Sequence, residues 1–265
     1  MGDPIPVRMG DLVMRVMRDT LNPDLVQFSA ALPSPDLLPT EKLTRLLAAV
    51  TRREQHRSDV YEVPPGCEEL RVQVARRALE AGCRLTPDDI LVTCRCQEAV
   101  VLSLRAVCKA GDVVAVESPA YFNFLQAIEL LGLRALEVPT HPEEGMRLDA
   151  LQEAISRHPI RACLLSTNFS NPLWATMPEE KRGELVALLA RHDIPLIEDD
   201  IYGDLSFAGL RPRLAKSFDR KGLVLLCSSF SKTQDPRYRH RHRRVPGERR
   251  LRPPPPPGPP PWDGL

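Results

Sequence analysis

Lys232 stands among four hydroxyl side chains in the stretch over residues 228–233, Ser-Ser-Phe-Ser-Lys-Thr. The apolar run over residues 222–227 predicts a buried strand, so the lysine follows a strand end. A lysine in such a place can lose its proton, attack an aldehyde and hold a cofactor as a Schiff base. The alternative is a solvated lysine in an ordinary Ser-rich loop, and this stretch alone leaves both interpretations open.

Two other predicted strands end in groups that suit a flat, phosphorylated ligand. The strand over residues 89–93 runs into Cys94-Arg95-Cys96-Gln97 at the start of a helix, where N–H groups can bind an anion such as phosphate. Tyr121 follows the strand over residues 113–117, and its ring can stack on a flat ligand. The alternatives are an ordinary helix cap and an aromatic side chain packed onto the domain.

Two more strand ends carry an amide, a carboxylate and a phenol. Asn171 follows the predicted strand over residues 162–166 and can donate a hydrogen bond to a ligand, although an Asx turn before a proline is the alternative. Asp199 follows the predicted strand over residues 195–198, and its carboxylate can pair with a protonated ring nitrogen. Tyr202 can reach the same ring. The alternative is a pair of surface acids that cap the next turn.

As a set, these groups are more specific than any one of them alone. They occur at the ends of successive predicted strands, and ligands of open α/β sheets bind at the carboxyl edge. A phosphorylated pyridine aldehyde needs such a set. The carboxylate keeps the ring nitrogen protonated, and the lysine forms the imine and later moves the proton.

The elements that must position these groups alternate between short apolar strands and amphipathic helices. This alternation predicts βαβ units and a three-layer α/β/α fold with a mostly parallel sheet. A further predicted strand spans residues 133–138, and the three prolines of residues 28–39 predict an extended segment. Predicted helices span residues 8–19, 67–81, 97–109, 121–131, 148–157 and 178–192, with another that Thr40 caps.

Over roughly residues 20–233, the chain resembles pyridoxal-phosphate enzymes of the aspartate-aminotransferase fold, fold type I, among the class I/II aminotransferases. It is similar in particular to the aminotransferase-like domain of the GntR-type regulators called MocR. The motifs that carry the resemblance are Ser-x-Ser-Lys at 229–232, Asp-x-x-Tyr at 199–202, Asn-Pro at 171–172 and Pro-x-aromatic at 119–121. The resemblance implies pyridoxal 5′-phosphate as the cofactor.

The resemblance also implies a role for each matched residue. Lys232 carries the cofactor, with Ser229 and Ser231 near its phosphate. Asp199 meets the pyridine nitrogen, while Tyr202 and Asn171 are directed at the ring oxygen O3′. The other implied contacts are Tyr121 on the ring face, Cys96 and Gln97 in the phosphate-binding turn of residues 94–97, Arg239 on the phosphate, and Tyr61 on the phosphate of the neighbouring subunit.

The sequence departs from the family pattern at three places. Arg95 stands where the phosphate-binding turn usually has glycine, and Trp174 stands where the loop usually reads Asn-Pro-x-Gly. Glycine permits a positive φ and a close approach of the backbone to a ligand. After Thr233 the family pattern decays.

Residues 233–265 differ in composition from the rest of the chain. They contain 10 of the 27 prolines, and eight arginines against three acids give them a charge of +5, which leaves −4 for the remainder. We therefore expect an Arg/Pro-rich disordered tail over 234–265, after an N-terminal arm over 1–60 and a large cofactor-binding domain over 61–233. A Pro-rich ligand for SH3-like domains or a basic arm for nucleic acid are the alternatives for the tail.

The resemblance implies a small C-terminal domain with an arginine for the substrate carboxylate, and its pattern does not follow Lys232. We therefore expect that a reading-frame disruption or truncation occurred soon after this lysine and removed that domain. The winged-helix pattern of MocR regulators is not seen either. Because the body is also mildly acidic, we expect no nucleic-acid partner.

The seven cysteines lack zinc-ligand spacing, which favours reduced thiols and a cytoplasmic location. No run of 18 apolar residues occurs, so no membrane span is expected. We expect a homodimeric, pyridoxal-phosphate-binding aminotransferase-like protein that acts on an amino acid and a 2-oxo acid. The alternatives are a non-catalytic, cofactor-binding remnant of a MocR regulator and an inactive truncated product.

Overall fold

The computed structural model describes residues 3–6, 10, 18–19, 22, 24–26, 31, 33–54, 62–207 and 209–234. All described elements belong to one unit, Met1–Asp235. The predicted helix over residues 8–19 lies largely outside the described residues, and so does the predicted tail.

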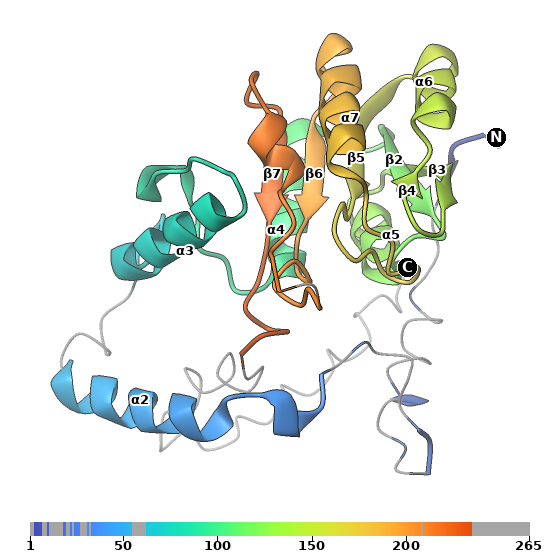
Figure 1. The fold of residues 1–265 in the computed structure, drawn as a ribbon. Helices are drawn as coiled ribbons and strands as arrows, with labels where there is room; N and C mark the ends of the chain where they lie inside the picture. The colour runs from blue at the N-terminus through green and yellow to red at the C-terminus, as the bar shows by residue number, and fades with distance from the viewer. Residues whose placement is uncertain are drawn as a thin grey trace, which may run out of the picture. The chain divides into compact units, whose positions relative to one another are not determined.

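A mostly parallel sheet forms the centre of this unit (Figure 1). Its order is β1-β3-β2-β5-β6-β7, with β4 beside β3. Strands β3, β2, β5, β6 and β7 run parallel, while β1 and β4, two residues each and absent from the sequence prediction, pair antiparallel with β3. The strands are β1 Ile5–Pro6, β2 Val113–Ser118, β3 Arg134–His141, β4 Gly145–Met146, β5 Ile160–Leu165, β6 Leu196–Asp199 and β7 Val224–Cys227.

Helices cover both faces of the sheet, so the predicted three-layer α/β/α fold is confirmed. Successive strand residues point to opposite faces. Leu196 therefore joins the core beneath α6 and α7, while Ile197 joins the core beneath α4 and α5. These helices are α4 Cys96–Val107, α5 Phe122–Leu130, α6 Leu148–Arg157 and α7 Glu179–Arg191. Among the described helices, none is both long and apolar enough to cross a bilayer.

The helices before the sheet differ from the prediction at their starts. Helix α2 spans Thr40–Arg53, and its cap position is Pro39. Thr40 is therefore the first residue of the helix and not its cap, and no described side chain makes a capping hydrogen bond there. The predicted extended segment also contains a 3-10 turn at Pro35–Leu37, because a single turn tolerates a proline at its start. The next helix, α3 (Glu68–Glu80), ends before Gly82 as predicted.

The predicted strand over residues 89–93 is wrong. A 3-10 turn spans Pro87–Asp89, and the segment that follows pairs with no strand of the described sheet, which ends at β7. Its Val92 N–H instead donates to the Pro65 carbonyl at 2.9 Å. The backbone of Ile90 is extended, as the apolar pattern predicts, but a strand also needs a partner, which a local pattern does not supply.

Candidate cofactor site

Three consecutive acids occupy the carboxyl end of β6, and strand alternation separates them. Asp199 faces α4. Glu198 and Asp200 face the opposite layer, where Glu198 accepts the Ala215 N–H at 2.8 Å and Asp200 pairs with Arg211. Glu198 and Asp200 therefore serve the fold, and Asp199 is the carboxylate available on the α4 side.

The Asp199 carboxylate is buried, with 5% of the residue exposed. Its Oδ1 accepts the Cys96 thiol at 3.5 Å and the Ile201 N–H at 3.1 Å. Burial raises the pKa of Asp199 from its ordinary value of 3.8 to about 7, and the charge of Asp200 adds to that effect. The hydrogen bonds offset only part of the desolvation. A cation beside Asp199 would therefore be strongly favoured.

Tyr202 and Asn171 meet at the same edge. They follow the neighbouring parallel strands β6 and β5, so their loops emerge side by side. The Asn171 side chain hydrogen-bonds to Tyr202 and lowers the pKa of the phenol, although burial outweighs this and raises it overall. The sequence resemblance implies one shared target for these two groups, and the structure brings them together.

Lys232 follows β7, which is the next strand of the sheet. Its Nζ lies 5.4 Å from the centroid of the Tyr202 ring. The same Nζ donates to the Ala31 carbonyl at 2.8 Å. The lysine thus shares the edge with Tyr202 and its partner.

Tyr121 is linked to the start of α4 through Asn123. The Asn123 amide donates to the Tyr121 hydroxyl at 2.6 Å, and the Gln97 amide donates to the Asn123 carbonyl at 2.8 Å. Burial raises the pKa of Tyr121, and the charges of Tyr202 and Asp199 raise it further. The predicted stacking ring therefore lies close to the predicted ring partners.

The predicted phosphate turn forms the amino end of α4, where N–H groups extend beyond the helix. Arg95 is the cap residue with φ −158°, an extended backbone that any residue adopts, so the backbone conformation here does not require the family's glycine. The Glu98 carboxylate accepts the Cys94 N–H at 2.5 Å and places one acid beside the turn.

The loop that carries the lysine is held from within and from α3. The Ser229 hydroxyl donates to Ser231 Oγ at 3.1 Å, and the Ser231 N–H donates to Ser229 Oγ at 3.2 Å. The Arg77 guanidinium lies 4.9 Å from the centroid of the Phe230 ring. The two predicted serines thus shape the turn before Lys232.

Two predicted contacts, Tyr61 and Arg239, lie outside the described residues. Two aromatic residues near the site were not assigned a role from the sequence. Trp174 stacks on Phe169 at 5.3 Å between ring centroids and lies 5.5 Å from the Tyr202 ring. The sequence did contain one indication of a role for this loop, because Trp174 stands where the family usually has glycine.

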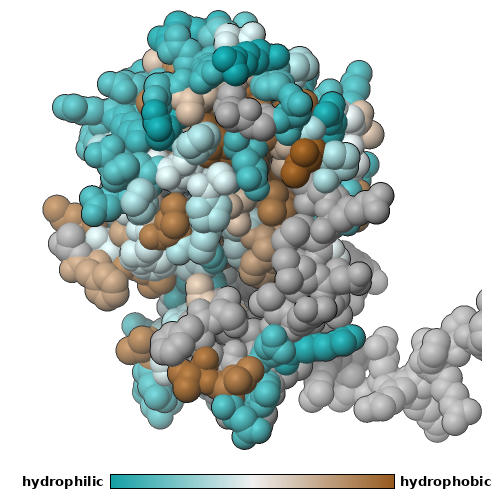
Figure 2. All heavy atoms as spheres, turned by 90° about the vertical axis from the view of Figure 1, so that its right-hand side faces the viewer, coloured by the Kyte–Doolittle hydropathy of each residue, from teal (hydrophilic) through white to brown (hydrophobic). Residues whose placement is uncertain are grey.

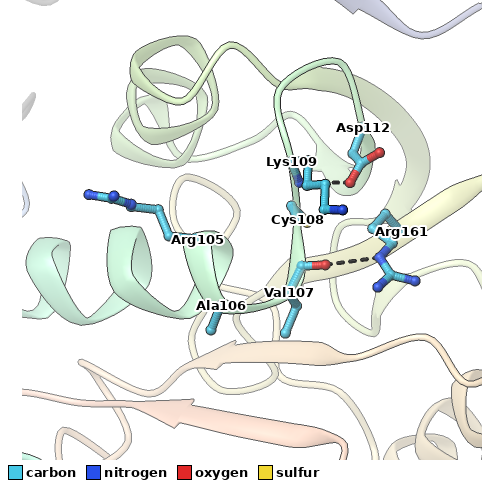
Figure 3. A pocket seen from close by; sticks show the side chains of 7 residues that line it. All are labelled: Arg105, Ala106, Val107, Cys108, Lys109, Asp112 and Arg161. Atoms are coloured by element: carbon cyan, nitrogen blue, oxygen red, sulfur yellow. Dashed lines mark hydrogen bonds between the residues drawn. The ribbon is translucent and has the colours of Figure 1, made fainter.

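A surface hollow of about 390 Å³ lies elsewhere (Figure 3). It adjoins the carboxyl end of α4, about 16 Å along the helix from the predicted phosphate turn. The cations around it do not converge, because Arg105 points away from Lys109 and Arg161 (Figure 3). This hollow is therefore separate from the candidate site.

Comparison with known proteins places this architecture among aminotransferases. Residues 32–234 match the family model for aminotransferase class I and II. The chain is 42% identical over 233 residues to the uncharacterized HTH-type transcriptional regulator YdcR of Escherichia coli, covering 88% of this chain and 50% of the relative. It is 31% identical over 228 residues to the 2-aminoadipate transaminase of Thermus thermophilus, covering 84% and 56%.

A solved structure with the same fold is kynurenine aminotransferase of Pyrococcus horikoshii in complex with PMP, with a TM-score of 0.79 and 27% identity. The alignment covers 86% of this chain and 57% of that one. This chain therefore spans about half the length of the curated relatives it matches. The resemblance recognised from the motifs is confirmed, and the chain belongs to the aminotransferase class I and II family.

Proposed function

We propose that this chain binds pyridoxal 5′-phosphate through Lys232 and supports amino-group transfer between an amino acid and a 2-oxo acid. The observation that carries the proposal is the gathering of Lys232, Tyr202, Asn171 and Asp199 at one edge of the sheet. Family membership agrees with the cofactor.

The residues present fit this cofactor at its most demanding point, the ring nitrogen. Asp199 is buried on the α4 side without a cationic side chain among its pKa-shifting neighbours. A protonated pyridine nitrogen would supply the missing positive charge, and the carboxylate would in turn hold the proton on that nitrogen. The amino end of α4 suits the phosphate because its N–H groups and helix dipole favour an anion.

Each residue of the candidate site would have its own role toward the cofactor. When bound, the cofactor supplies an aldehyde for covalent attachment and an electron-withdrawing ring. Lys232 would anchor that aldehyde carbon and carry a proton on Nζ. Tyr202 and Asn171 would orient the ring through its oxygen O3′, and Tyr121 would cover one face. Ser229, Ser231, Cys96 and Gln97 would hold the phosphate, together with Arg239 and with Tyr61 from a second copy.

Borohydride trapping tests the proposal directly. Purified protein is mixed with pyridoxal phosphate, reduced with borohydride and digested, and the peptide that gains the pyridoxyl mass is identified. We expect the label on Lys232 and its loss in Lys232→Ala. Lys221→Ala is the matched control, because Lys221 is exposed and pairs with Asp193 outside the site. A label that survives Lys232→Ala, or no label in the natural protein, contradicts the proposal.

A cofactor-binding regulatory domain is the second candidate. The observation that favours it is 42% identity to an HTH-type regulator against 31% to a transaminase. The two functions differ in turnover. After loading, amino acids are added and conversion of the cofactor to its amine form is followed by absorbance. Conversion supports the transferase, whereas stable binding without conversion supports the regulatory domain.

We also propose that the protein forms a homodimer in the cytoplasm. Val63 is 72% exposed, Leu91 57% and Val92 37%, and the Val92 N–H bonds to Pro65, so these apolar residues lie in neighbouring segments. The surface seen from the side of α6 is mostly hydrophilic, with hydrophobic residues in small separate groups (Figure 2).

All seven cysteines are thiols, which suits the reducing compartment that we propose.

A further inference from the structure

The loop between β5 and α7 contains two aromatic residues in an unfavourable backbone region. Phe169 has φ +49° and Trp174 has φ +62°. L-residues other than glycine, asparagine and aspartate rarely adopt positive φ, which costs about 1–2 kcal/mol per residue. Such strain persists only where the surroundings over-determine the conformation, and it concentrates at functional sites.

The loop is closed by its own backbone. The Ser170 N–H donates to the Ala175 carbonyl at 2.9 Å, and the Trp174 N–H donates back to the Ser170 carbonyl at 2.5 Å. Ala175 and Met177 are buried after it, at 2% and 1% exposure. The backbone of Trp174 is therefore held from both sides, which limits the positions that its ring can take.

The ring of Trp174 bridges two other rings. It stacks on Phe169 with an interplanar angle of 30°, and it meets the Tyr202 ring at 58° and 5.5 Å. Aromatic pairs at these distances contribute beyond their buried area. Asn171, which hydrogen-bonds to Tyr202, lies on the same loop three residues before Trp174.

Tyr202 is the point at which this loop reaches the lysine. Asp199 is the titratable group whose charge acts on Tyr202 from β6, Tyr202 in turn acts on Tyr121 in the segment before α5, and Lys232 faces the Tyr202 ring from the loop after β7. The Trp174 ring packs against the Tyr202 ring. Its removal would leave Tyr202 less confined.

We propose that Trp174 is a positioning residue that clamps Tyr202 and, through the loop, Asn171 in the orientation in which both serve the cofactor oxygen O3′. This inference rests on the proposed function, because the two donors matter only if the cofactor is bound. Phe169 supports the clamp by stacking on the Trp174 ring.

The clamp has a spectroscopic consequence. Hydrogen bonds to O3′ disperse its negative charge and weaken its hold on the proton at Lys232 Nζ, so that proton leaves at lower pH. When Tyr202 and Asn171 are held less firmly, the proton stays to higher pH. The midpoint of the visible absorbance change with pH therefore rises.

The experiment compares the full chain, loaded with pyridoxal phosphate, with three variants. Trp174→Gly and Trp174→Asn remove the ring and suit a positive φ, so both are expected to fold. Trp174→Phe keeps an aromatic ring as the matched control. We expect the midpoint of the absorbance change with pH to rise by roughly half to one pH unit in Trp174→Gly and Trp174→Asn. In Trp174→Phe it should stay near the value of the natural protein. Because Trp174→Gly can still displace Asn171 when Tyr202 lacks its hydroxyl, Trp174→Gly combined with Tyr202→Phe should shift the midpoint by less than the sum of the two single shifts.

An unchanged midpoint in Trp174→Gly and Trp174→Asn, or shifts that add in the double variant, overturns the inference while the proposed function stands. If the natural protein does not bind pyridoxal phosphate, the proposed function fails and the inference fails with it. A second readout needs no cofactor: burial raises the pKa of Tyr202, so loss of the ring should lower it in an ultraviolet titration referenced to Tyr202→Phe. An unchanged tyrosine titration also overturns the clamp.

Discussion

At the scale of single residues, the candidate site depends on which way each side chain of β6 points. Glu198, Asp199 and Asp200 have the same chemistry and are adjacent in sequence. Their partners nevertheless differ, because alternate residues face alternate layers. Asp200 pairs with Arg211, whereas no cationic side chain is among the described groups that act on Asp199, whose pKa burial raises to about 7.

Asp199→Asn tests this at the residue scale. The folded-state pKa of Asp199, about 7, lies above its ordinary value of 3.8, so the group's contribution to stability is complete below pH 3.8 and is lost as pH rises through 7. Without cofactor, we expect the variant to be more stable by roughly 1–3 kcal/mol at pH 8, with little gain at pH 4. Urea unfolding at both pH values measures this. Cofactor affinity should fall at least about tenfold as the ring-nitrogen partner is lost.

Glu117→Gln is the control for that prediction. Burial also raises the pKa of Glu117 to about 7, and its Oε1 lacks a hydrogen-bond partner in the described part of the chain. The variant should gain stability at pH 8 for the same reason, yet bind pyridoxal phosphate normally. Equal loss of cofactor binding in both variants would show that the Asp199 effect is not local.

At the scale of elements, the ends of helices and strands place the functional groups. The amino end of α4 brings Cys96 beside Asp199, and the last turn of α3 brings Arg77 over the lysine loop. Helix α3 stops at Gly82, whose φ is +81°, and the Cys83 N–H donates to the Ala78 carbonyl at 2.8 Å. Glycine is required there by conformation and by space.

Gly82→Ala and Gly111→Ala separate these two requirements. Both glycines have positive φ, but a Cβ at Gly82 would lie 2.9 Å from Arg213 Nε, whereas a Cβ at Gly111 would meet nothing within 4 Å. We expect Gly111→Ala to cost about 1 kcal/mol from backbone strain alone and Gly82→Ala to cost more. Chemical unfolding of both variants gives the difference. Equal costs would mean that Arg213 moves aside without penalty.

At the scale of the whole molecule, apolar side chains remain exposed in a segment that has no partner among the described strands. Residues 90–93 have no strand partner in the described sheet, and Leu91 there is 57% exposed. Exposed apolar groups on an unpaired segment favour association with another chain. This is the physical basis for the proposed homodimer.

Leu91→Lys tests that association. A charge at the centre of an apolar interface must be desolvated, so we expect the dimer dissociation constant to rise at least about tenfold. Leu130→Lys is the control, since Leu130 is 72% exposed at the end of α5 and is not part of the proposed surface. Sedimentation equilibrium measures both. A monomeric natural protein, or equal weakening by the two variants, contradicts the proposed interface.

The sequence by itself determined the three-layer fold and the order of chemical groups along its carboxyl edge. Alternation and helical spacing are local properties, so β2, β3, α6 and α7 were predicted within a few residues of their observed bounds. The strand motifs also indicated Lys232, Asp199 and Tyr202 as residues of one site. In each case the information lay within a short stretch of chain.

Only the tertiary structure decided which of these groups meet. The pairing of Cys96 with Asp199 and the packing of Trp174 on Tyr202 join segments far apart in sequence. The failure of the strand at residues 89–93 has the same origin, because a strand depends on a partner elsewhere in the chain. Burial likewise sets the pKa of Asp199, and burial is a property of the packed layers rather than of any local pattern.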